Sequence, residues 1–179
     1  LGILLLARDP AAAVLPALAS TRPGIPSART AIAICIRRED MALVLPPLAR
    51  LLAGLAAAGA ADRFSLWFLS DTPEGEEARA EEAACRAFAA AQPIATHYRR
   101  RAQNTGFKSG NVMEFLDHHA DGHDFMLCLD ADSEMTAKTV LRLVACMEAD
   151  AKLAILQQLI HGRPTGIAFP RLFQFGMRQ

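Results

Sequence analysis

Hydrophobic positions along the chain follow two alternating spacings, and this alternation predicts the order of the secondary-structure elements. Short apolar runs typical of buried strands cover residues 30–36, 64–69, 94–98, 125–129 and 153–157. Helical spacing of apolar residues fills most of the intervals, at residues 46–59, 74–91, 107–120 and 136–148. Strands that alternate with helices predict right-handed β-α-β units. The expected fold class is α/β, with a mostly parallel sheet flanked by helices.

The helix expected after the first strand shows how these boundaries are set. Four charged residues, Arg37 to Asp40, end the apolar strand abruptly. The helix is expected to be settled from about Pro46, because a first helical turn tolerates proline, and Gly59 ends it. Its apolar side keeps helical spacing through Leu48, Leu51, Leu52 and Leu55.

Composition narrows the class of protein. The chain has 179 residues and a formal net charge of zero, which argues against a nucleic-acid partner bound through counterion release. Four cysteines, none in a C-x-x-C pair, predict buried reduced thiols in a reducing compartment. We therefore expect neither a zinc site nor a disulfide framework.

Both ends of the chain have features of a piece of a longer protein. It begins with Leu1 rather than Met, and an apolar-periodic run lies close to Gln179. The opening residues 1–6 are apolar but too few to cross a bilayer, which needs about 20 residues. They fit either the end of a membrane helix or an ordinary strand. Residues 7–29 have no clear period and are interpreted as a connector on the surface.

Two carboxylates follow the apolar run at residues 125–129. Asp130 and Asp132 alternate on one side of an extended backbone, so both can face one ion. Ligands of α/β sheets bind outside the carboxyl ends of strands. Carboxylate oxygens are the ligands that Mg²⁺ and Mn²⁺ prefer, which favours a metal site. The alternative is a helix N-cap cluster, since aspartate also favours that position.

Acidic residues end two other predicted strands. Glu39 and Asp40 follow the first strand, and Asp71 follows the second. Asp71 fits a carboxylate that accepts hydrogen bonds from a base or ribose. It also fits a turn residue, because Asp-Thr-Pro is good turn chemistry. Clustering of acids at carboxyl ends of strands is what a nucleotide site with a metal needs.

Basic and small residues open the helix at 107–120. The segment Lys108-Ser109-Gly110-Asn111 combines free backbone N–H groups, a cation and a close-approach glycine, which suits a diphosphate. It is not a P-loop, and an ordinary helix start explains it equally well. The preceding run Arg99 to Arg101 is either a solvated charge run or, with Lys108, a basic rim for phosphates.

Other catalytic patterns are absent from the sequence. His118, His119 and His123 have a spacing that favours a solvated helix end over a metal cluster. No serine or cysteine has the strand–turn–helix setting of a nucleophile, and neither G-x-S-x-G nor G-x-G-x-x-G occurs.

The order and intervals of these motifs resemble an inverting family-2 glycosyltransferase. The motifs are an acidic end to the first strand, L-S-D at the second, then Y-R-R-R, K-S-G-N and L-D-A-D-S. The resemblance runs from about Leu5 to Gln157. Within the family, the chain most resembles the glucans biosynthesis glucosyltransferase H type, which is related to bacterial cellulose synthase. It implies the type A fold of nucleotide-diphospho-sugar transferases, incomplete in this chain.

The resemblance also implies the chemistry and the organisation of the chain. Residues 1–29 would be a juxtamembrane connector, 30–160 the donor-binding part and 161–179 the start of a truncated acceptor part. The implied donor is UDP-glucose, the cofactor Mg²⁺ or Mn²⁺, and the acceptor a growing β-glucan. The implied location is the cytoplasmic side of a bacterial inner membrane, reached through segments outside this chain.

Individual site residues follow from the same resemblance. Asp71 would contact the uracil and Glu39 the nucleoside. Lys108, Gly110 and Asn111 would lie near the diphosphate. Asp130 would bind both donor and metal, and Asp132 the metal. Gln157 matches a glutamine that ends the next strand in relatives.

The sequence departs from the family pattern in two ways. Relatives show P-x-x-N-E at the first strand end, where this chain has Cys35-Ile36-Arg37-Arg38-Glu39, so Arg38 replaces the asparagine. The general base in a later E-D pair and the Q-x-x-R-W motif have no counterpart. No catalytic base is therefore expected before residue 179, and the chain alone is expected to be inactive.

Two other functions fit parts of the pattern. A haloacid-dehalogenase-like phosphotransferase also places D-x-D after an apolar strand, although that motif normally opens its core domain. A non-catalytic nucleotide-sugar sensor or interaction module would keep the donor site and lack the transfer half.

Overall fold

A computed structural model describes residues 21–22 and 24–157 of the chain. Its centre is a four-stranded sheet in the order β3-β2-β1-β4, with every neighbouring pair parallel. The strands are β1 (Thr30–Ile36), β2 (Phe64–Ser70), β3 (Ala95–Arg100) and β4 (Phe125–Asp130). The expected α/β class and parallel sheet are confirmed.

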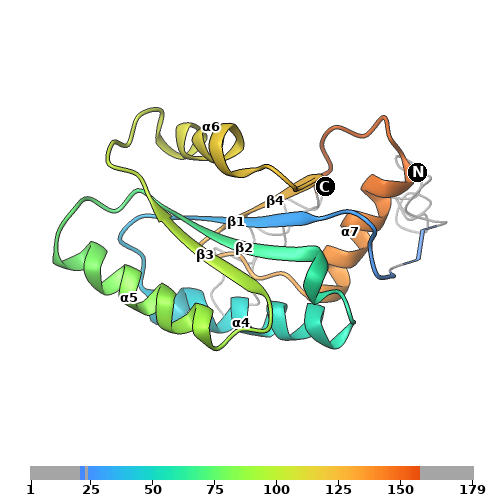
Figure 1. The fold of residues 1–179 in the computed structure, drawn as a ribbon, viewed down its shortest axis with the longest axis horizontal. Coiled ribbons are helices and arrows are strands. Elements are labelled where there is room, and N and C mark those ends of the chain that lie inside the picture. The colour runs from blue at the N-terminus through green and yellow to red at the C-terminus, as the bar shows by residue number, and fades with distance from the viewer. Residues whose placement is uncertain (1–20, 23, 158–179) are drawn as a thin grey trace, which may run out of the picture.

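Helices cover both faces of the sheet, as Figure 1 shows. They are α4 (Met41–Ala57), α5 (Glu76–Ala90), α6 (Phe107–His119) and α7 (Ala137–Ala149), with a short 3₁₀ turn η1 (Ala61–Arg63) before β2. Among the described helices, α4, α5 and α7 lie on one face and α6 lies on the other. The chain thus forms a three-layer α/β arrangement around β1 and β2.

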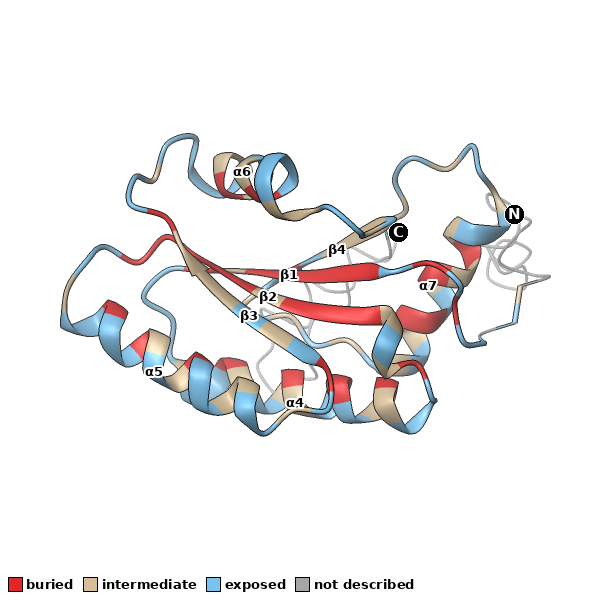
Figure 2. Ribbon diagram, viewed as in Figure 1, coloured by how far each residue is buried: buried red, intermediate tan, exposed pale blue. Residues whose placement is uncertain are grey.

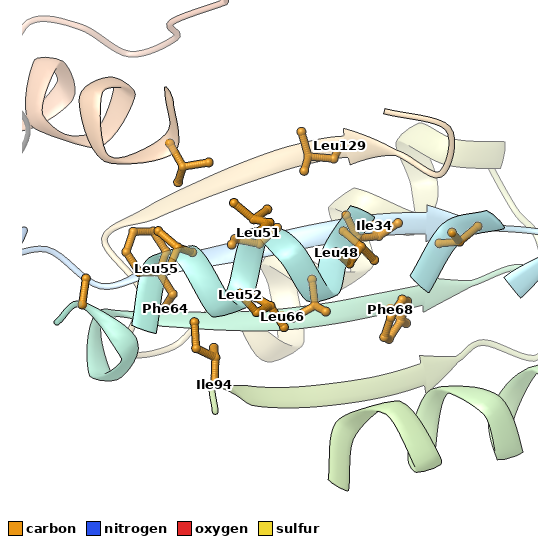
Figure 3. Close-up of a cluster of buried hydrophobic side chains, with 14 of the residues drawn as sticks. Ile34, Leu48, Leu51, Leu52, Leu55, Phe64, Leu66, Phe68, Ile94 and Leu129 are labelled. Carbon is orange, nitrogen blue, oxygen red and sulfur yellow. The ribbon is translucent and has the colours of Figure 1, made fainter. Parts of the chain in front are cut away.

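The larger core lies between the sheet and α4 (Figure 3). Leu51, Leu52 and Leu55 of α4 are at most 2% exposed and pack against Ile34 of β1 and Leu66 of β2. Full burial of one such side chain stabilises the fold by about 1.5–3 kcal/mol. The periodicity that predicted the helix is therefore the periodicity that builds this core.

The opposite face holds a smaller cluster beneath α6. Phe115 of α6 is fully buried against Ala31 and Ala33 of β1, whose small side chains let the helix approach the sheet. Trp67 of β2 lies edge-on to Phe115 at 5.2 Å between ring centroids, and His119 lies 5.6 Å from Trp67.

The nearby histidines form no metal cluster in the described part of the chain. His123 is half-buried, and its Nε2 atom lies 2.8 Å from the hydroxyl of Ser65. The expected solvated helix end therefore fits His118, which is exposed, but not His119 and His123, which contact the sheet.

The start of α4 differs from the sequence prediction. The helix begins at Met41 rather than near Pro46, because Asp40 is its N-cap and its carboxylate accepts a hydrogen bond from Ala42 N at 3.0 Å. Pro46 and Pro47 consequently lie inside the helix. Asp40 thus acts as a cap at the strand end and is not one of the carboxylates around the site.

The predicted strand at residues 153–157 is wrong. The structure shows a turn and irregular backbone there, with Ile155 85% exposed. No strand pairs with the outer edge of β4 among the described residues. An apolar run becomes a strand only where a neighbouring backbone completes its hydrogen bonds, so the pattern alone was insufficient. Gln157 accordingly ends no strand.

Burial of the cysteines was predicted only in part. Cys85 and Cys146 are buried, and burial raises the pKa of the Cys85 thiol to about 12. Cys35 is half-buried, and Cys128 is exposed because β4 is an edge strand of the described sheet. Figure 2 shows the same contrast between the buried strands β1 and β2 and the partly exposed β4. The structure shows all four cysteines as free thiols.

The terminal segments lie mostly outside the described residues. The structure does not describe residues 1–20, 23 and 158–179, so the predictions for the opening apolar run and for 161–179 fall outside the described residues. Of the predicted connector, Ser27 and Ala28 donate backbone hydrogen bonds to Glu148 of α7 at 2.7 and 2.8 Å. No helix within the described ranges has the length and apolarity required to cross a membrane.

Candidate functional site

A cavity of about 500 Å³ opens at the carboxyl edge of the sheet. The loops after β1, β2 and β4 contribute to it, together with the start of α6. Its lining consists of Cys35, Ile36, Arg37, Glu39, Asp71, Asn104, Phe107, Lys108, Asp130, Ala131 and Asp132.

Strand order explains why a cavity forms here. From β1 the chain adds β2 and β3 on one side, and then returns to place β4 on the other side of β1. The loops after β1 and β4 therefore diverge, which is the switch point where ligands of open α/β sheets bind. Cys35 pairs with Asp130 in the ladder, so the loops begin at the same level.

Asp71 lies on the floor of the cavity in a buried ion pair. Arg101 donates from Nε to one carboxylate oxygen of Asp71 and from Nη2 to the other, the latter at 3.0 Å. Their side chains are 4% and 7% exposed. The hydrogen bond to Asp71 raises the pKa of Arg101 despite burial. A two-point guanidinium contact fixes the orientation of the carboxylate as well as its charge.

Arg101 also holds the loop that leads into α6. Its guanidinium donates to Asn104 Oδ1 at 2.9 Å, to the Thr105 carbonyl at 2.8 Å and to the Phe107 carbonyl at 2.7 Å. One buried cation thus connects the end of β2 to the loop before α6. Lys108 lies in the first turn of this helix.

Lys108 and Asp130 both line the cavity and form a partly exposed ion pair with each other. The hydrogen bond to Asp130 raises the pKa of the Lys108 amine. Glu39 and Asp132 line the same space. Five of the residues predicted from the sequence are therefore brought together: Glu39, Asp71, Lys108, Asp130 and Asp132.

Gly110 and Asn111 do not line the cavity. Asn111 is fully buried and donates from Nδ2 to the Leu69 carbonyl at 3.0 Å, which fastens α6 to β2. A Cβ on Gly110 would lie 1.9 Å from the Thr105 carbonyl oxygen, so this position requires glycine for close approach. Both residues hold the first turns of α6, which carry Lys108, and neither residue lines the cavity.

Comparison with known proteins identifies the family. Residues 32–176 match the sequence model of the family described as "Glycosyl transferase family 2". The chain belongs to glycosyl transferase family 2. The resemblance inferred from the motifs is thereby confirmed, and the parallel α/β sheet agrees with the fold of this family.

Three curated relatives of this chain carry the same name. "Glucans biosynthesis glucosyltransferase H" of Caulobacter vibrioides (strain NA1000 / CB15N) is 35% identical over 153 residues, which are 84% of this chain and 23% of the relative. The protein of that name from Xylella fastidiosa (strain 9a5c) is 36% identical over 154 residues, 82% of this chain and 23% of the relative. The protein of that name from Pseudomonas putida (strain W619) is 34% identical over 164 residues, which are 89% of this chain and 19% of the relative. The chain spans about a quarter or less of these relatives.

Family-2 membership excludes one of the alternative functions. A haloacid-dehalogenase-like phosphotransferase carries its D-x-D motif at the start of its core domain. Here Asp130 and Asp132 come at the end of β4, the last of the four described strands, and the family match covers both. The alternative is therefore wrong.

The carboxylates of this family-2 site suit a cation that is shared with a ligand. Among the described residues no three side chains of His, Cys, Asp or Glu converge to hold an ion by themselves. Asp130 at the end of β4 and Asp132 in the turn that follows supply two carboxylates to the cavity lining. Mg²⁺ is typically bound by one or two carboxylates together with substrate phosphates and water, so this donor set fits such an ion.

Arg101 is a supporting residue of the site that the sequence interpretation missed, and Asn104 and Phe107 of the cavity lining were missed as well. The two interpretations of the basic run, a solvated charge run and a basic rim for phosphates, both predicted an exposed Arg101. The residue is instead buried, at 7% exposed. Arg99 is also paired, donating to Glu114 at 3.1 Å and to the Asn111 carbonyl at 3.0 Å. The two-residue spacing of Arg99 and Arg101 places them on one side of an extended chain, a signal that distinguishes them from Arg100.

A second buried network supports the loops around the cavity. The Glu81 carboxylate on α5 is 5% exposed and accepts hydrogen bonds from Ser70 at 2.5 Å, Thr72 at 2.6 Å and Tyr98 at 3.0 Å. Burial raises the pKa of Tyr98 to about 12, so its hydroxyl stays a donor. Thr72 in turn accepts from Arg38 N at 2.8 Å. The network joins the loops that follow β1 and β2.

Arg38 has a backbone conformation that explains the asparagine of the family pattern. Its φ angle is 58°, in the left-handed region that asparagine adopts more readily than arginine. The side chain points to solvent and pairs with Glu77 at 3.0 Å, with both side chains more than half exposed. The departure therefore affects backbone strain, and this side chain does not line the cavity.

We expect Arg38→Asn to raise the free energy of unfolding by about 0.5–1 kcal/mol. Relief of left-handed strain outweighs the lost ion pair, because exposed pairs contribute little. Urea denaturation measures the change. The control is Arg37→Asn, whose φ is negative and which should bring no gain. A loss of stability in Arg38→Asn alone would contradict this account.

Proposed function

We propose that the chain is the donor-binding part of a membrane glucosyltransferase that transfers glucose from UDP-glucose to a growing β-glucan with inversion. Membership of glycosyl transferase family 2 supports a nucleotide-sugar donor. The name of the relatives supports glucose and a glucan product. We further propose that the transferase sits in a bacterial inner membrane with this part on the cytoplasmic side.

One observation carries the proposal. Asp71, Lys108, Asp130 and Asp132 come from three separate segments, yet they line one cavity at the switch point of the sheet. A nucleoside diphosphate has a base that seeks hydrogen bonds and a diphosphate that seeks cations. The buried carboxylate of Asp71 and the ammonium of Lys108 meet these two needs from adjacent walls.

The proposed roles follow from charge. In the transfer, an acceptor hydroxyl attacks the anomeric carbon, its proton passes to a general base, and the bond to the UDP oxygen breaks. Lys108 would stabilise the negative charge that develops on the departing diphosphate. A Mg²⁺ or Mn²⁺ ion held by Asp130 and Asp132 would supply Lewis-acid stabilisation of the same charge. No base is assigned among the described residues.

Calorimetry of UDP binding tests the proposal on the complete gene product that contains this chain. We expect UDP to bind in the presence of Mn²⁺, and Asp132→Asn to weaken that binding at least about tenfold. Even groups that only orient metal ligands contribute about 10- to 100-fold, so a direct ligand should contribute no less.

The control is Asp117→Asn, which changes an exposed carboxylate on α6 that does not line the cavity. It should bind UDP like the unmodified protein. Metal-dependent UDP binding that survives Asp132→Asn would remove Asp132 from the site. Absence of UDP binding in the unmodified protein would overturn the donor assignment.

A nucleotide-sugar sensor is the second candidate, because the described residues contain the donor cavity and no assigned base. Turnover separates the two. Release of UDP from UDP-glucose by the complete gene product supports the enzyme, and tight UDP-glucose binding without release supports the sensor.

A further inference from the structure

Asn104 is fixed beside Asp71 by a shared guanidinium nitrogen. Arg101 Nη2 donates to Asp71 Oδ2 at 3.0 Å and to Asn104 Oδ1 at 2.9 Å. Because a guanidinium can only donate, the oxygen of the Asn104 amide must face Arg101. The amide NH₂ group has no partner among the described residues, and Asn104 lines the cavity. The wall therefore presents a hydrogen-bond donor next to a carboxylate acceptor.

Phe107 presents a large apolar ring beside these groups. It lines the same cavity and is 74% exposed. Its φ angle is 51°, which is rare for a bulky residue, and Arg101 holds its carbonyl at 2.7 Å. The backbone thus keeps the ring out of the core, where an aromatic side chain would otherwise gain stability by burial. Strain of this kind, held by surrounding bonds, occurs at ligand sites.

We propose that Asn104 and Phe107 select and hold the base of the donor nucleotide, with Asn104 as the residue that discriminates uracil from cytosine. The inference rests on the proposed nucleotide-sugar donor. Uracil has an imide N–H beside a carbonyl oxygen, which match the Asp71 carboxylate and the Asn104 NH₂ group. Cytosine reverses both, with a ring nitrogen that accepts and an amino group that donates. The Phe107 ring stacks on the base, as exposed aromatics do in other nucleotide sites.

The geometry gives Arg101 the role of a positioning residue. It does not line the cavity, yet it contacts the carboxylate, the amide and the carbonyl of all three base-contacting residues. Edge recognition and stacking therefore act through different side chains on one support, so they can be separated by substitution.

Titrations of the complete gene product with UDP, CDP and pyrophosphate, each with Mn²⁺, test the proposal. The unmodified protein should bind UDP about 10- to 100-fold more tightly than CDP, the discrimination expected of a two-point contact to a base edge. Asn104→Ala should weaken UDP binding about tenfold and leave CDP binding unchanged. Asn104→Asp should bring the affinities for UDP and CDP still closer together. Pyrophosphate lacks a base, so its affinity should stay constant in both variants.

Substitutions of Phe107 test stacking separately. Phe107→Ala should weaken the binding of UDP and of CDP equally, by about tenfold, because every base offers a face on which an aromatic ring can stack. Phe107→Tyr should restore both affinities. Phe107→Gly also removes the ring but suits a left-handed backbone, so it separates loss of stacking from loss of fold. The matched control is Met113→Ala, which truncates another exposed apolar residue of α6 away from the cavity.

The outcomes decide the proposal. An unchanged UDP-to-CDP ratio in both Asn104 variants, or pyrophosphate affinity that falls in step with UDP affinity, overturns it while leaving the donor site in place. Absence of UDP binding in the unmodified protein overturns the proposed function and this inference together.

Discussion

Arg101→Met is expected to lower the free energy of unfolding by about 3–5 kcal/mol. Removal of one partner of a buried ion pair leaves an uncompensated buried charge, and losses of this size follow. Here the charge is the Asp71 carboxylate, whose side chain is 7% exposed. The Thr105 and Phe107 carbonyls and the Asn104 amide also lose their common donor. The loop before α6, and with it the first turn of α6 where Lys108 lies, is then no longer tied to β2.

Urea denaturation measures the effect, and UDP titration measures its consequence for the cavity. Arg101→Lys should recover little stability, because an ammonium cannot reproduce the planar two-point contact. Arg100→Met is the matched control: Arg100 precedes Arg101 in the chain and makes no ion pair among the described residues. Equal losses in the Arg100 and Arg101 variants would refute the assigned role.

Gly110→Ala is expected to lower the free energy of unfolding by about 3 kcal/mol and to abolish tight donor binding. Alanine normally stabilises a helix relative to glycine by about 0.5–1 kcal/mol, so the expected sign is opposite to that of helix propensity. The new Cβ would lie 1.9 Å from the Thr105 carbonyl oxygen and 3.2 Å from Arg101 Nη1. Overpacking against backbone usually costs about 1–3 kcal/mol and sometimes more, because side-chain rotation cannot relieve it.

The neighbouring substitution Ser109→Ala is the control for Gly110→Ala. Ser109 is exposed in the same turn of α6, so its replacement tests helix propensity without the clash. It should leave stability unchanged or slightly raised. A stabilised Gly110→Ala protein would show that the loop at Thr105 can move away, and that the close approach is dispensable.

Much of the cavity was predictable because its residues follow strands directly. Asp71, Asp130 and Glu39 each come within a few residues of the end of an apolar run, and parallel strands bring their carboxyl ends to one edge. Lys108 was predicted from the residues that open α6. The roles of all these residues in donor and metal binding stay predictions.

The supporting residues were less predictable, because their partners are distant in sequence. Arg101 is assigned by its contact with Asp71, and the inward turn of Arg99 by Glu114, neither of which a run of three arginines reveals. The hydrogen bond from Asn111 to the Leu69 carbonyl was also not predicted, and its place near a diphosphate stays a prediction. Asp40 was read as one of the acids at a strand end, and it caps α4 instead.

The sequence by itself determined the order of strands and helices, the parallel sheet and the acidic carboxyl edge, because period and chain direction are local properties. The tertiary structure alone decided which charges are buried, which strand edge lies open at Cys128, and which backbone positions are left-handed at Arg38 and Phe107. These depend on which groups meet across the fold. A buried arginine and a solvated one have the same letter in the sequence, and only the position of Asp71 distinguishes them.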